Sequence, residues 1–434
     1  MIDSQVNSLR YQILKGTASG FMIQAGFAVL SFVTVTILAR LLSLEDFGAY
    51  SNAFAWVNIL AVLGTFGFNS LLLRDMAILR TQNKWALMKG FLRFSDGLII
   101  AISMILMFIL WGIAGILFAT PEKVQLRFAL WLAAPLIPLY ALIYIRQAAM
   151  RGLEQVTRAM LPDSIIRPAL TLAVILGAHF IFPDFIDSRV VILLSVIVTV
   201  IAVLISLLWL QNMLPAGLNE IQPDYQAKEW IKAAAPMFVI GCTQIFIGQL
   251  PTVMLGVLSN ARSIGFYAVA SRVANLLIFL PMVVGIVVGP MIARLYSSGE
   301  RIRLQNIIKK TNRLTFALTF LLSVFMFVFA KNILSIFGPE FKNANNALTL
   351  LIMGYLIDTG LGMSILTLMM TGHEHEVARY QAGFTVLLVV LCIVLIPSRG
   401  YEGAAIAFMT VMVISRFVFV FLAKKHVEIN TSIF

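Results

Sequence analysis

Long apolar runs, separated by short charged gaps, constrain this chain more than any other feature. A helix that crosses the hydrocarbon of a bilayer needs ~20 mostly apolar residues, and the runs reach that length. A water-soluble fold would leave too much apolar surface in solvent, because 60% of the residues are hydrophobic, only 12% are charged and the mean hydropathy is +0.94. The sequence therefore predicts twelve membrane-spanning helices, at 16–41, 48–73, 97–119, 126–150, 163–182, 189–213, 230–258, 264–294, 313–337, 344–371, 378–397 and 401–423.

The distribution of lysine and arginine between alternate loops predicts the orientation. Taking the N-terminus and every second loop as one side places 22 cations there and 8 on the other side, with Arg272 and Arg416 inside spans. Cytoplasmic loops carry the excess of cations, so both termini are predicted to be cytoplasmic. The net charge of +12 then follows from topology and from attraction to anionic lipid, and nucleic acid is not needed as a partner.

A short pattern occurs twice, half a chain apart. Residues 47–58, FGAYSNAFAWVN, align without gaps with residues 264–275, IGFYAVASRVAN, at an offset of 217 in a chain of 434. The alignment pairs Gly48 with Gly265, Tyr50 with Tyr267 and Asn58 with Asn275. A second, weaker match pairs 151–170, after the fourth run, with 371–388, after the tenth.

Both matches fall at equivalent places in two sets of six runs, and the sets have the same orientation because six is even. Parallel repeats related by an axis along the membrane normal are a transporter pattern. The predicted fold class is therefore an all-α polytopic membrane protein with two parallel-repeat six-helix bundles. The predicted parts are an N-terminal lobe at 1–213, a cytoplasmic linker at 214–229 and a C-terminal lobe at 230–434.

Three segments resemble a known family. ILARLLSLEDFGAYSNAF resembles the first turn of bacterial polysaccharide flippases, MRGLEQVTRAMLPDSIIRPAL resembles the loop after their fourth helix, and LIPSRGYEGAAIAFMTV resembles their final turn. These anchors lie in order over residues 37–411. The chain is thus similar to the Wzx-like O-antigen and polysaccharide flippases of the multidrug/oligosaccharidyl-lipid/polysaccharide (MOP) exporter superfamily.

The resemblance implies a two-lobed, V-shaped, MATE-like carrier in the bacterial inner membrane. Such a carrier moves an undecaprenyl-diphosphate-linked oligosaccharide, as used for O-antigen and lipopolysaccharide, from the cytoplasmic to the periplasmic leaflet by alternating access. The partners implied are that oligosaccharide, membrane lipids, H⁺ or Na⁺ as coupling ion, and polysaccharide polymerase and chain-length machinery. No cofactor, metal or catalytic residue is implied, so an enzyme is not expected. A multidrug extrusion antiporter and a peptidoglycan-precursor lipid flippase stay open as alternatives.

Two ionisable residues lie well inside predicted spans, where a charge costs ~2.5–3.5 kcal/mol and marks a functional candidate. Arg272 follows Ile264 by eight residues, which places it about 12 Å along the eighth span at ~1.5 Å per residue. It is predicted to bind a diphosphate or an acidic sugar, because a guanidinium pairs with phosphate oxygens. Asp358 is predicted to couple transport to an ion, since burial favours its protonated form. The alternative for both is a salt bridge to each other.

The remaining substrate-contact candidates are four amides and one cation: Asn58, Asn275, Gln24, Gln244 and Arg167. Amides suit sugar hydroxyls, but hydrogen bonding between helices is an equal alternative. Arg167 either faces the cytoplasmic mouth of a cleft or extends to the inner surface. Arg416 is expected to extend to the surface, and the aromatic residues Trp56, Tyr140 and Tyr144 are expected to pack.

The charged gaps are interpreted as structural. Arg40, Glu45 and Asp46 are predicted to fix the outer connection between the first two spans. Residues 74–94 and 294–313 combine cations with apolar residues at helical spacing, which is typical of amphipathic helices on an anionic membrane surface.

Overall fold

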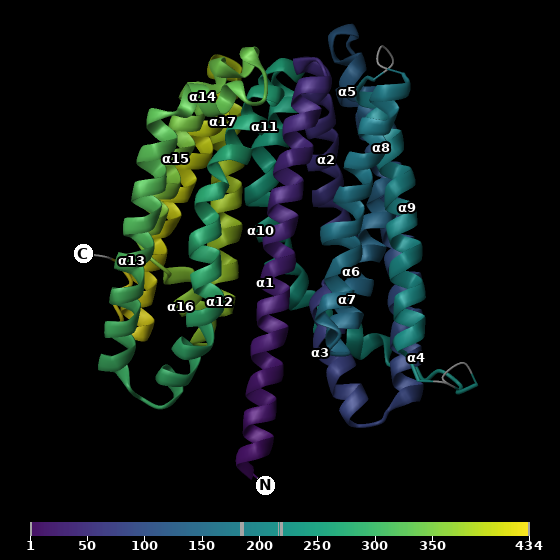
Figure 1. Cartoon of the computed structure of the whole chain (residues 1–434), viewed down its shortest axis with the longest axis vertical. Helices are drawn as coiled ribbons and strands as arrows, with labels where there is room; N and C mark the ends of the chain where they lie inside the picture. The colour runs from purple at the N-terminus through teal and green to yellow at the C-terminus, as the bar shows by residue number, and fades with distance from the viewer. Residues whose placement is uncertain (1, 183–185, 216, 218–219, 433–434) are drawn as a thin grey trace. The chain divides into compact units, whose positions relative to one another are not determined.

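The computed structural model (Figure 1) describes residues 2–182, 186–215, 217 and 220–432, and side chains from Met22 onward. All regular structure in these residues is helical. The first half contains α1 (Ile2–Leu41), α2 (Leu44–Gly64), α3 (Phe68–Thr81), α4 (Trp85–Leu117), η1 (Pro121–Lys123), α5 (Val124–Ala133), α6 (Leu136–Gly152), α7 (Val156–Leu161), η2 (Pro162–Ile166), α8 (Arg167–Ile181) and α9 (Ser188–Met213). The second contains α10 (Ala227–Leu258), α11 (Ala261–Ala274), α12 (Leu276–Ser297), α13 (Arg301–Val328), α14 (Ala330–Ser335), η4 (Pro339–Ala344), α15 (Asn345–Gly360), α16 (Ser364–Met370) and α17 (Glu374–Val427).

Nine helices in the described part of the chain are long and apolar enough to cross a membrane, and up to eleven candidates result if each of two bent helix pairs counts as one span. The bent pairs are Pro121–Ala133 with Leu136–Gly152, at 44°, and Pro339–Gly360 with Ser364–Met370, at 46°. Proline and glycine at these bends remove backbone bonds or permit unusual dihedral angles. The candidates agree with ten of the predicted runs, and α17 covers the last two.

α17 is a helical hairpin rather than one straight rod. Its 54 residues would extend ~80 Å at ~1.5 Å per residue, far more than the ~30 Å of hydrocarbon. The backbone is non-helical at Gly400, with φ 55° and ψ −131°. The rings of Phe384 and Phe419, on either side of this glycine, lie 5.9 Å apart. With α17 taken as two antiparallel helices, the structure is compatible with the twelve predicted spans.

The predicted repeat appears in the ends of the helices. Ser43 caps α2 and Asn260 caps α11, each accepting a bond from the backbone amide three residues on, and these two residues are 217 positions apart. The turn after α3 is closed by Lys84 N to Leu79 O, and the turn after α12 by Glu300 N to Leu295 O. Each of these turns contains a residue with positive φ, as a Schellman-type cap requires, namely Asn83 and Gly299. Local sequence therefore encodes the same connections in both halves.

The chain forms two compact units by its contacts: unit 1 is Met1–Asp46 with Ala53–Ile245, and unit 2 is Phe47–Asn52 with Phe246–Phe434. α2 thus contributes to both units, and so does α10. The predicted lobes at 1–213 and 230–434 stay a prediction. Within unit 2, α15 packs on α17, α13 and α11, and α12 packs on α13.

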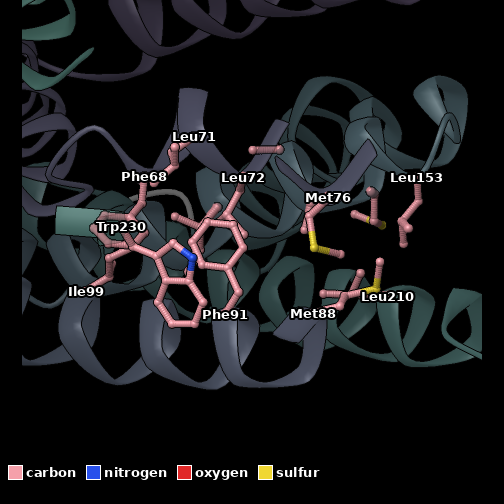
Figure 2. Close-up of a cluster of buried hydrophobic side chains, with 14 of the residues drawn as sticks. Phe68, Leu71, Leu72, Met76, Met88, Phe91, Ile99, Leu153, Leu210 and Trp230 are labelled. Carbon is pink, nitrogen blue, oxygen red and sulfur yellow. The ribbon is translucent and has the colours of Figure 1, made fainter. Parts of the chain in front are cut away.

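A core cluster of unit 1 lies where α3, α4 and α6 meet the start of α10 (Figure 2). The ring of Trp230 lies 4.8 Å from that of Phe91 and 5.6 Å from that of Phe94. Figure 2 shows Phe68 and Phe91 gathered beside Trp230. Aromatic side chains bury large apolar areas, so this cluster fixes α10 to unit 1 through its first turns.

The linker before α10 is held against α4. Lys89 Nζ donates to Ile221 O at 2.7 Å, and Asp224 N donates to Ala86 O at 3.1 Å. A Cβ at Gly90 would lie 1.7 Å from Asp224 O, so only glycine permits this approach. Residues 216 and 218–219 of the predicted linker lie outside the described residues.

Asp46 is the central residue of the connection between α1 and α2, which lies within residues 39–54. Its carboxylate accepts bonds from Ser43 Oγ at 2.7 Å, Gln125 Nε2 at 2.6 Å, Ser188 Oγ at 2.7 Å and Ser188 N at 3.2 Å. It thereby ties the start of α2 to α5 and to the start of α9. Arg40 and Glu45 are exposed, so the structural role predicted for this gap belongs chiefly to Asp46.

We expect Asp46→Ala to lower the free energy of unfolding by ~2 kcal/mol, because bonds to a charged acceptor are lost and half-buried donors are left unsatisfied. Glu45→Ala is the matched control on the same turn and should stay within ~0.5 kcal/mol of wild type. Denaturation in mixed micelles, followed by tryptophan fluorescence, measures both. Equal effects of the two variants would contradict this role of Asp46.

The two basic segments are not single surface helices, which corrects the prediction made for 74–94 and 294–313. Each is a helical hairpin: α3 ends at Thr81 and α4 begins at Trp85, whereas α12 ends at Ser297 and α13 begins at Arg301. The residues with positive φ in the turns end each first helix. Arg80 and Lys84 lie at the first turn, and Arg301 and Arg303 lie at the second, whereas the other cations lie farther along the helices.

Candidate functional site

Arg167 is the centre of a buried polar cluster in unit 1. Its Nε donates to Asp163 Oδ1 at 2.9 Å, and its Nη1 donates to Tyr140 Oη at 2.6 Å. The guanidinium also lies over the Tyr140 ring, 4.7 Å from the centroid. Tyr144 extends the cluster, with its ring 6.1 Å from that of Tyr140. Both groups of the Arg167–Asp163 pair are largely shielded, with side chains 19% and 17% exposed. Arg167 therefore does not extend to the surface, and Tyr140 does more than pack.

The cluster lies at an irregular turn of a candidate span. Residues Pro162–Ile166 form a π-helical turn between α7 and α8, and such turns are frequent at functional sites. Pro168 follows, and its ring would clash with the carbonyl four residues earlier in a regular α-helix. The widened turn places Asp163 and Arg167 on one face. Tyr140 lies one turn after the bend between α5 and α6.

Among the residues that the structure describes, the other candidates of unit 1 form no hydrogen bond with this cluster. Asn58 lies half-buried on α2, and Gln24 lies half-buried on α1. α1 packs against α7, η2 and α8, which places Gln24 on a helix adjacent to Arg167. Gln244 is exposed on α10. Their predicted contacts with substrate stay predictions.

In unit 2, Asp358 is paired with Arg416, and this corrects two expectations. Arg416 Nε donates to Asp358 Oδ1, with side chains 24% and 17% exposed. The salt bridge between Asp358 and Arg272 was therefore the wrong pairing, and Arg416 does not extend to the surface. Arg416 lies eleven residues before the end of α17, about 16 Å from the end of that helix at ~1.5 Å per residue.

The helix ends explain why an arginine is favoured there. Asp358 lies in the last turn of α15, which ends at Gly360 before the bend to α16. The C-terminal end of a helix carries partial negative charge and attracts a cation. Arg416 therefore neutralises both the carboxylate and the end of the helix.

Asn275 joins the same helix through Tyr355. Tyr355 Oη donates to Asn275 Oδ1 at 2.7 Å. Asn275 lies between α11 and α12, where one span is interrupted. Two interpretations of Asn275 were open, and the bond from Tyr355 supports the one in which Asn275 forms a hydrogen bond between helices. Within the part of the chain that the structure describes, its amide nitrogen donates no hydrogen bond, and contact with a substrate stays a prediction.

Arg272 occupies the last turn of α11, half-buried, with Tyr50 as an electrostatic neighbour. Tyr50 belongs to the segment of α2 that lies in unit 2. The structure thus places Arg272 close to Tyr50, the repeat partner of Tyr267. Its predicted contact with a phosphate stays a prediction.

Both clusters lie where a candidate span is interrupted. Arg167 and Tyr140 adjoin a π-turn and a bend, whereas Asp358 and Asn275 adjoin two helix breaks. In membrane transporters, discontinuous helices form the sites for substrate and coupling ion, because freed backbone groups face a cavity. Each cluster therefore places a charged pair at a break in a candidate span.

Sequence reasoning did not single out Asp163 or Tyr355 as parts of the site. Asp163 carries a visible signal, because it precedes Arg167 by four residues, the spacing of an ion pair on one helix face. Tyr355 carries a weaker one, since it precedes Asp358 by less than a turn. No signal linked Asp358 with Arg416, because they are 58 positions apart.

Residues 13–296 match the family described as "Polysaccharide biosynthesis protein", and residues 236–394 match the family described as "MatE". The first match covers more than half of the chain. No curated protein matches the sequence at a significant level.

Solved structures of membrane transporters are similar to the whole chain. An inward-facing multidrug resistance MATE family transporter of the MOP superfamily has a TM-score of 0.70 at 14% identity, over 94% of each chain. Lipid II flippase MurJ in its inward closed conformation has a TM-score of 0.70 at 13% identity, over 93% of this chain and 87% of that one. A MOP superfamily transporter from Pyrococcus furiosus has a TM-score of 0.61 at 14% identity, over 95% and 96%. These likenesses confirm the predicted all-α polytopic fold.

Proposed function

The chain belongs to the polysaccharide biosynthesis protein family, within the MOP exporter superfamily, and from this premise we propose that it flips an undecaprenyl-diphosphate-linked oligosaccharide across the bacterial inner membrane. The chain is a multi-pass membrane transporter. Movement from the cytoplasmic to the periplasmic leaflet by alternating access, with cytoplasmic termini and coupling to H⁺ or Na⁺, forms part of the proposal.

The observation that carries the proposal is the pair of arginine-containing clusters at broken spans. A diphosphate must pass ~30 Å of hydrocarbon, and guanidinium groups grip phosphate oxygens in pairs through their fixed fork of donors. Arg167 donates to the hydroxyl of Tyr140, and Arg416 donates to Asp358 on α15, the helix whose Tyr355 donates to the Asn275 amide oxygen. Sugars need hydroxyl and amide partners, so this chemistry suits a sugar diphosphate.

The two alternatives predict different cargo. The MurJ structure is that of a lipid II flippase, which supports a peptidoglycan-precursor substrate as the second candidate. A multidrug antiporter binds cations, which favours carboxylates without arginine partners. Here Asp163 and Asp358 are both paired with arginine, which supports an anionic cargo over a cationic one.

Complementation separates these functions. Expression in a strain that lacks its polysaccharide flippase should restore surface polysaccharide, whereas expression in a strain depleted of its lipid II flippase should not restore growth, and ethidium efflux should not rise. Restoration of growth without surface polysaccharide, or efflux alone, would overturn the proposal.

In the same assay, Arg272→Ala is expected to slow flipping roughly 10–100-fold. A hydrogen bond to a charged group contributes about 1.5–3 kcal/mol, which converts to that range of rates. Arg262→Ala is the matched control on the same helix. Arg262 is exposed, and its ion pair with Glu340 is long, at 4.0 Å, so its loss should change little. A well-expressed Arg272→Ala protein with full activity would remove Arg272 from the site.

A further inference from the structure

The segment that follows α17, residues 428–432, turns back into unit 2, and we call it the strap. Glu428 ends the helix in a left-handed conformation, with φ 62° and ψ 26°, which an α-helix cannot continue. Exposure then alternates along the chain, since Ile429 and Thr431 are 1% and 0% exposed whereas Glu428 and Asn430 lie at the surface. This period of two is that of an extended backbone with one side packed.

Side chains of α13 hold the outer part of the strap through its backbone. Arg301 Nη1 donates to Val427 O, at the point where α17 ends. Gln305 forms two bonds with Asn430, because its Nε2 donates to Asn430 O at 2.7 Å and its Oε1 accepts from Asn430 N at 2.8 Å. Arg301 and Gln305 are four residues apart, so they lie on one face of α13.

The inner end of the strap lies against the break between α15 and α16. Asn312, on the same face of α13 and 1% exposed, donates from Nδ2 to Thr431 O at 2.6 Å. A Cβ at Gly362 would lie 1.9 Å from Thr431 O and 2.4 Å from Asn312 Nδ2. Gly362 has φ 79°, and its backbone nitrogen donates to Thr359 O at 3.1 Å. The strap carbonyl therefore packs directly on the turn that ends α15.

Unit 1 contains a related arrangement. The linker after α9 lies on the start of α4, where Lys89 Nζ donates to Ile221 O, as the strap after α17 lies on the start of α13. Lys89 and Gln305 are 216 positions apart, which is within one residue of the repeat offset. A segment that follows the last span of a unit and packs on its basic-turn helix is thus a feature of both halves, and unit 2 adds the contact with Gly362.

The strap joins the helices that carry the buried ion pair of unit 2. Asp358 lies in the last turn of α15, four residues before Gly362, and pairs with Arg416 on α17. The strap begins at Val427, where the helix of Arg416 ends. It ends against Gly362, directly after the helix of Asp358. The backbone from Arg416 through the strap to this turn therefore connects the two charged residues a second time.

We propose that the strap positions Asp358 for its pairing with Arg416, and that Asn312 is the positioning residue that holds the strap in place. The strap acts as a wedge that maintains the 46° bend between α15 and α16. The bonds from α13 go to its backbone, and Thr431 Oγ1 is buried without a hydrogen-bond partner among the described residues. The wedge therefore needs the Thr431 carbonyl and not its hydroxyl. Its importance for flipping rests on the proposed function, whereas its effect on the ion pair does not.

Hydrogen–deuterium exchange of the purified full chain in micelles tests the strap. Asn312→Ala leaves the Thr431 carbonyl buried without its donor, so the amide of Asn430 and those of 361–364 should exchange roughly tenfold faster than in wild type. Thr431→Val keeps the carbonyl and should exchange as slowly as wild type. Thr315→Ala is the matched control, because Thr315 is also buried on α13 and its hydroxyl bonds within that helix; it should leave both segments unchanged.

A thermodynamic cycle separates positioning from ordinary packing. Substitutions at residues that do not act through one another have additive effects. If the strap positions Asp358, the effect of Asn312→Ala on the unfolding constant should be roughly fivefold smaller in the neutral variant Asp358→Asn/Arg416→Gln than in wild type. Gln305→Ala removes two bonds at the exposed end of the strap and should show the same dependence, so the test does not rely on a buried substitution alone.

The proposal is overturned if 361–364 exchange in Asn312→Ala as they do in wild type. It is also overturned if Asn312→Ala and Gln305→Ala have the same effects with and without the ion pair, or if Thr431→Val loosens the strap as Asn312→Ala does. None of these measurements uses a cargo, so their outcome is independent of the complementation that tests the proposed function.

Discussion

Replacing Arg416 by alanine is expected to lower the free energy of unfolding by roughly 3–5 kcal/mol, the largest stability loss that we predict for a single substitution in this chain. Removal of one partner from a buried ion pair leaves an uncompensated charge. Here that charge is Asp358, which is largely buried inside a bent candidate span. Denaturation in mixed micelles measures the loss.

The neutral double variant Asp358→Asn/Arg416→Gln separates the pair from its surroundings. It leaves no buried charge, so we expect it to recover at least half of the stability that Arg416→Ala loses. A loss below ~1 kcal/mol in the single variant would show that Asp358 is not desolvated as the contacts imply. A double variant as unstable as the sum of its single variants would deny the coupling between the two residues.

The same double variant tests the proposed ion coupling. An amide cannot bind and release a proton as a carboxylate does, so the double variant should flip cargo at one rate with and without a proton or sodium gradient, whereas loss of all flipping would reflect the removal of Arg416 from its cluster. An undiminished response would exclude Asp358 as the coupling residue. Stability and coupling are read from one protein, so a folding defect cannot be mistaken for loss of function.

Gly48→Ala is expected to destabilise unit 2 by about 3 kcal/mol or more. A Cβ at Gly48 would lie 1.8 Å from Ala261 O and 3.1 Å from the backbone nitrogen of Gly265. Overpacking usually costs ~1–3 kcal/mol, and here the obstacle is backbone, which cannot rotate away. Gly48 and Gly265 are the glycines that the repeat aligns, so the two copies of the pattern approach each other at these residues.

Gly112→Ala is the control for Gly48→Ala. A Cβ at Gly112, in α4, would meet nothing within 4 Å, so alanine there should be neutral or stabilise the helix by ~0.5–1 kcal/mol. Thermal unfolding in detergent, followed by size-exclusion chromatography, ranks the two variants. Similar melting of both would show that α2 and α11 can separate at little cost.

The fold could be predicted largely because its signals are local. The length of an apolar run defines a span, and most helices agree with their runs, as at 189–213 and Ser188–Met213. The repeat was visible in the pattern around Gly48 and Gly265, and it returns in the caps Ser43 and Asn260.

The site could be predicted only in part because its contacts are not local. Asp358 was marked correctly as a charged position inside a span, and Arg167 was marked as a candidate near the cytoplasmic end of one. Their ion-pair partners could not be predicted in the same way. Arg416 lies about two turns before Lys424, and at that position an arginine side chain is expected to extend to the membrane surface. The break after α15 brings Asp358 to α17 instead. Helix breaks depend on tertiary packing, as at Gly362, where a Cβ would lie 1.9 Å from Thr431 O.

The contribution of residues 47–52 to unit 2 has a consequence for the order of biogenesis. Asn52 Nδ2 donates to Thr252 O, 200 positions later, so α2 enters the bilayer long before its acceptor has been synthesised. Until then a buried amide lacks its bond, a cost that hydrocarbon makes severe. The first spans are therefore inserted before Asn52 has its acceptor. A chaperone or insertase that shields the polar face of α2 would have its greatest effect in that interval.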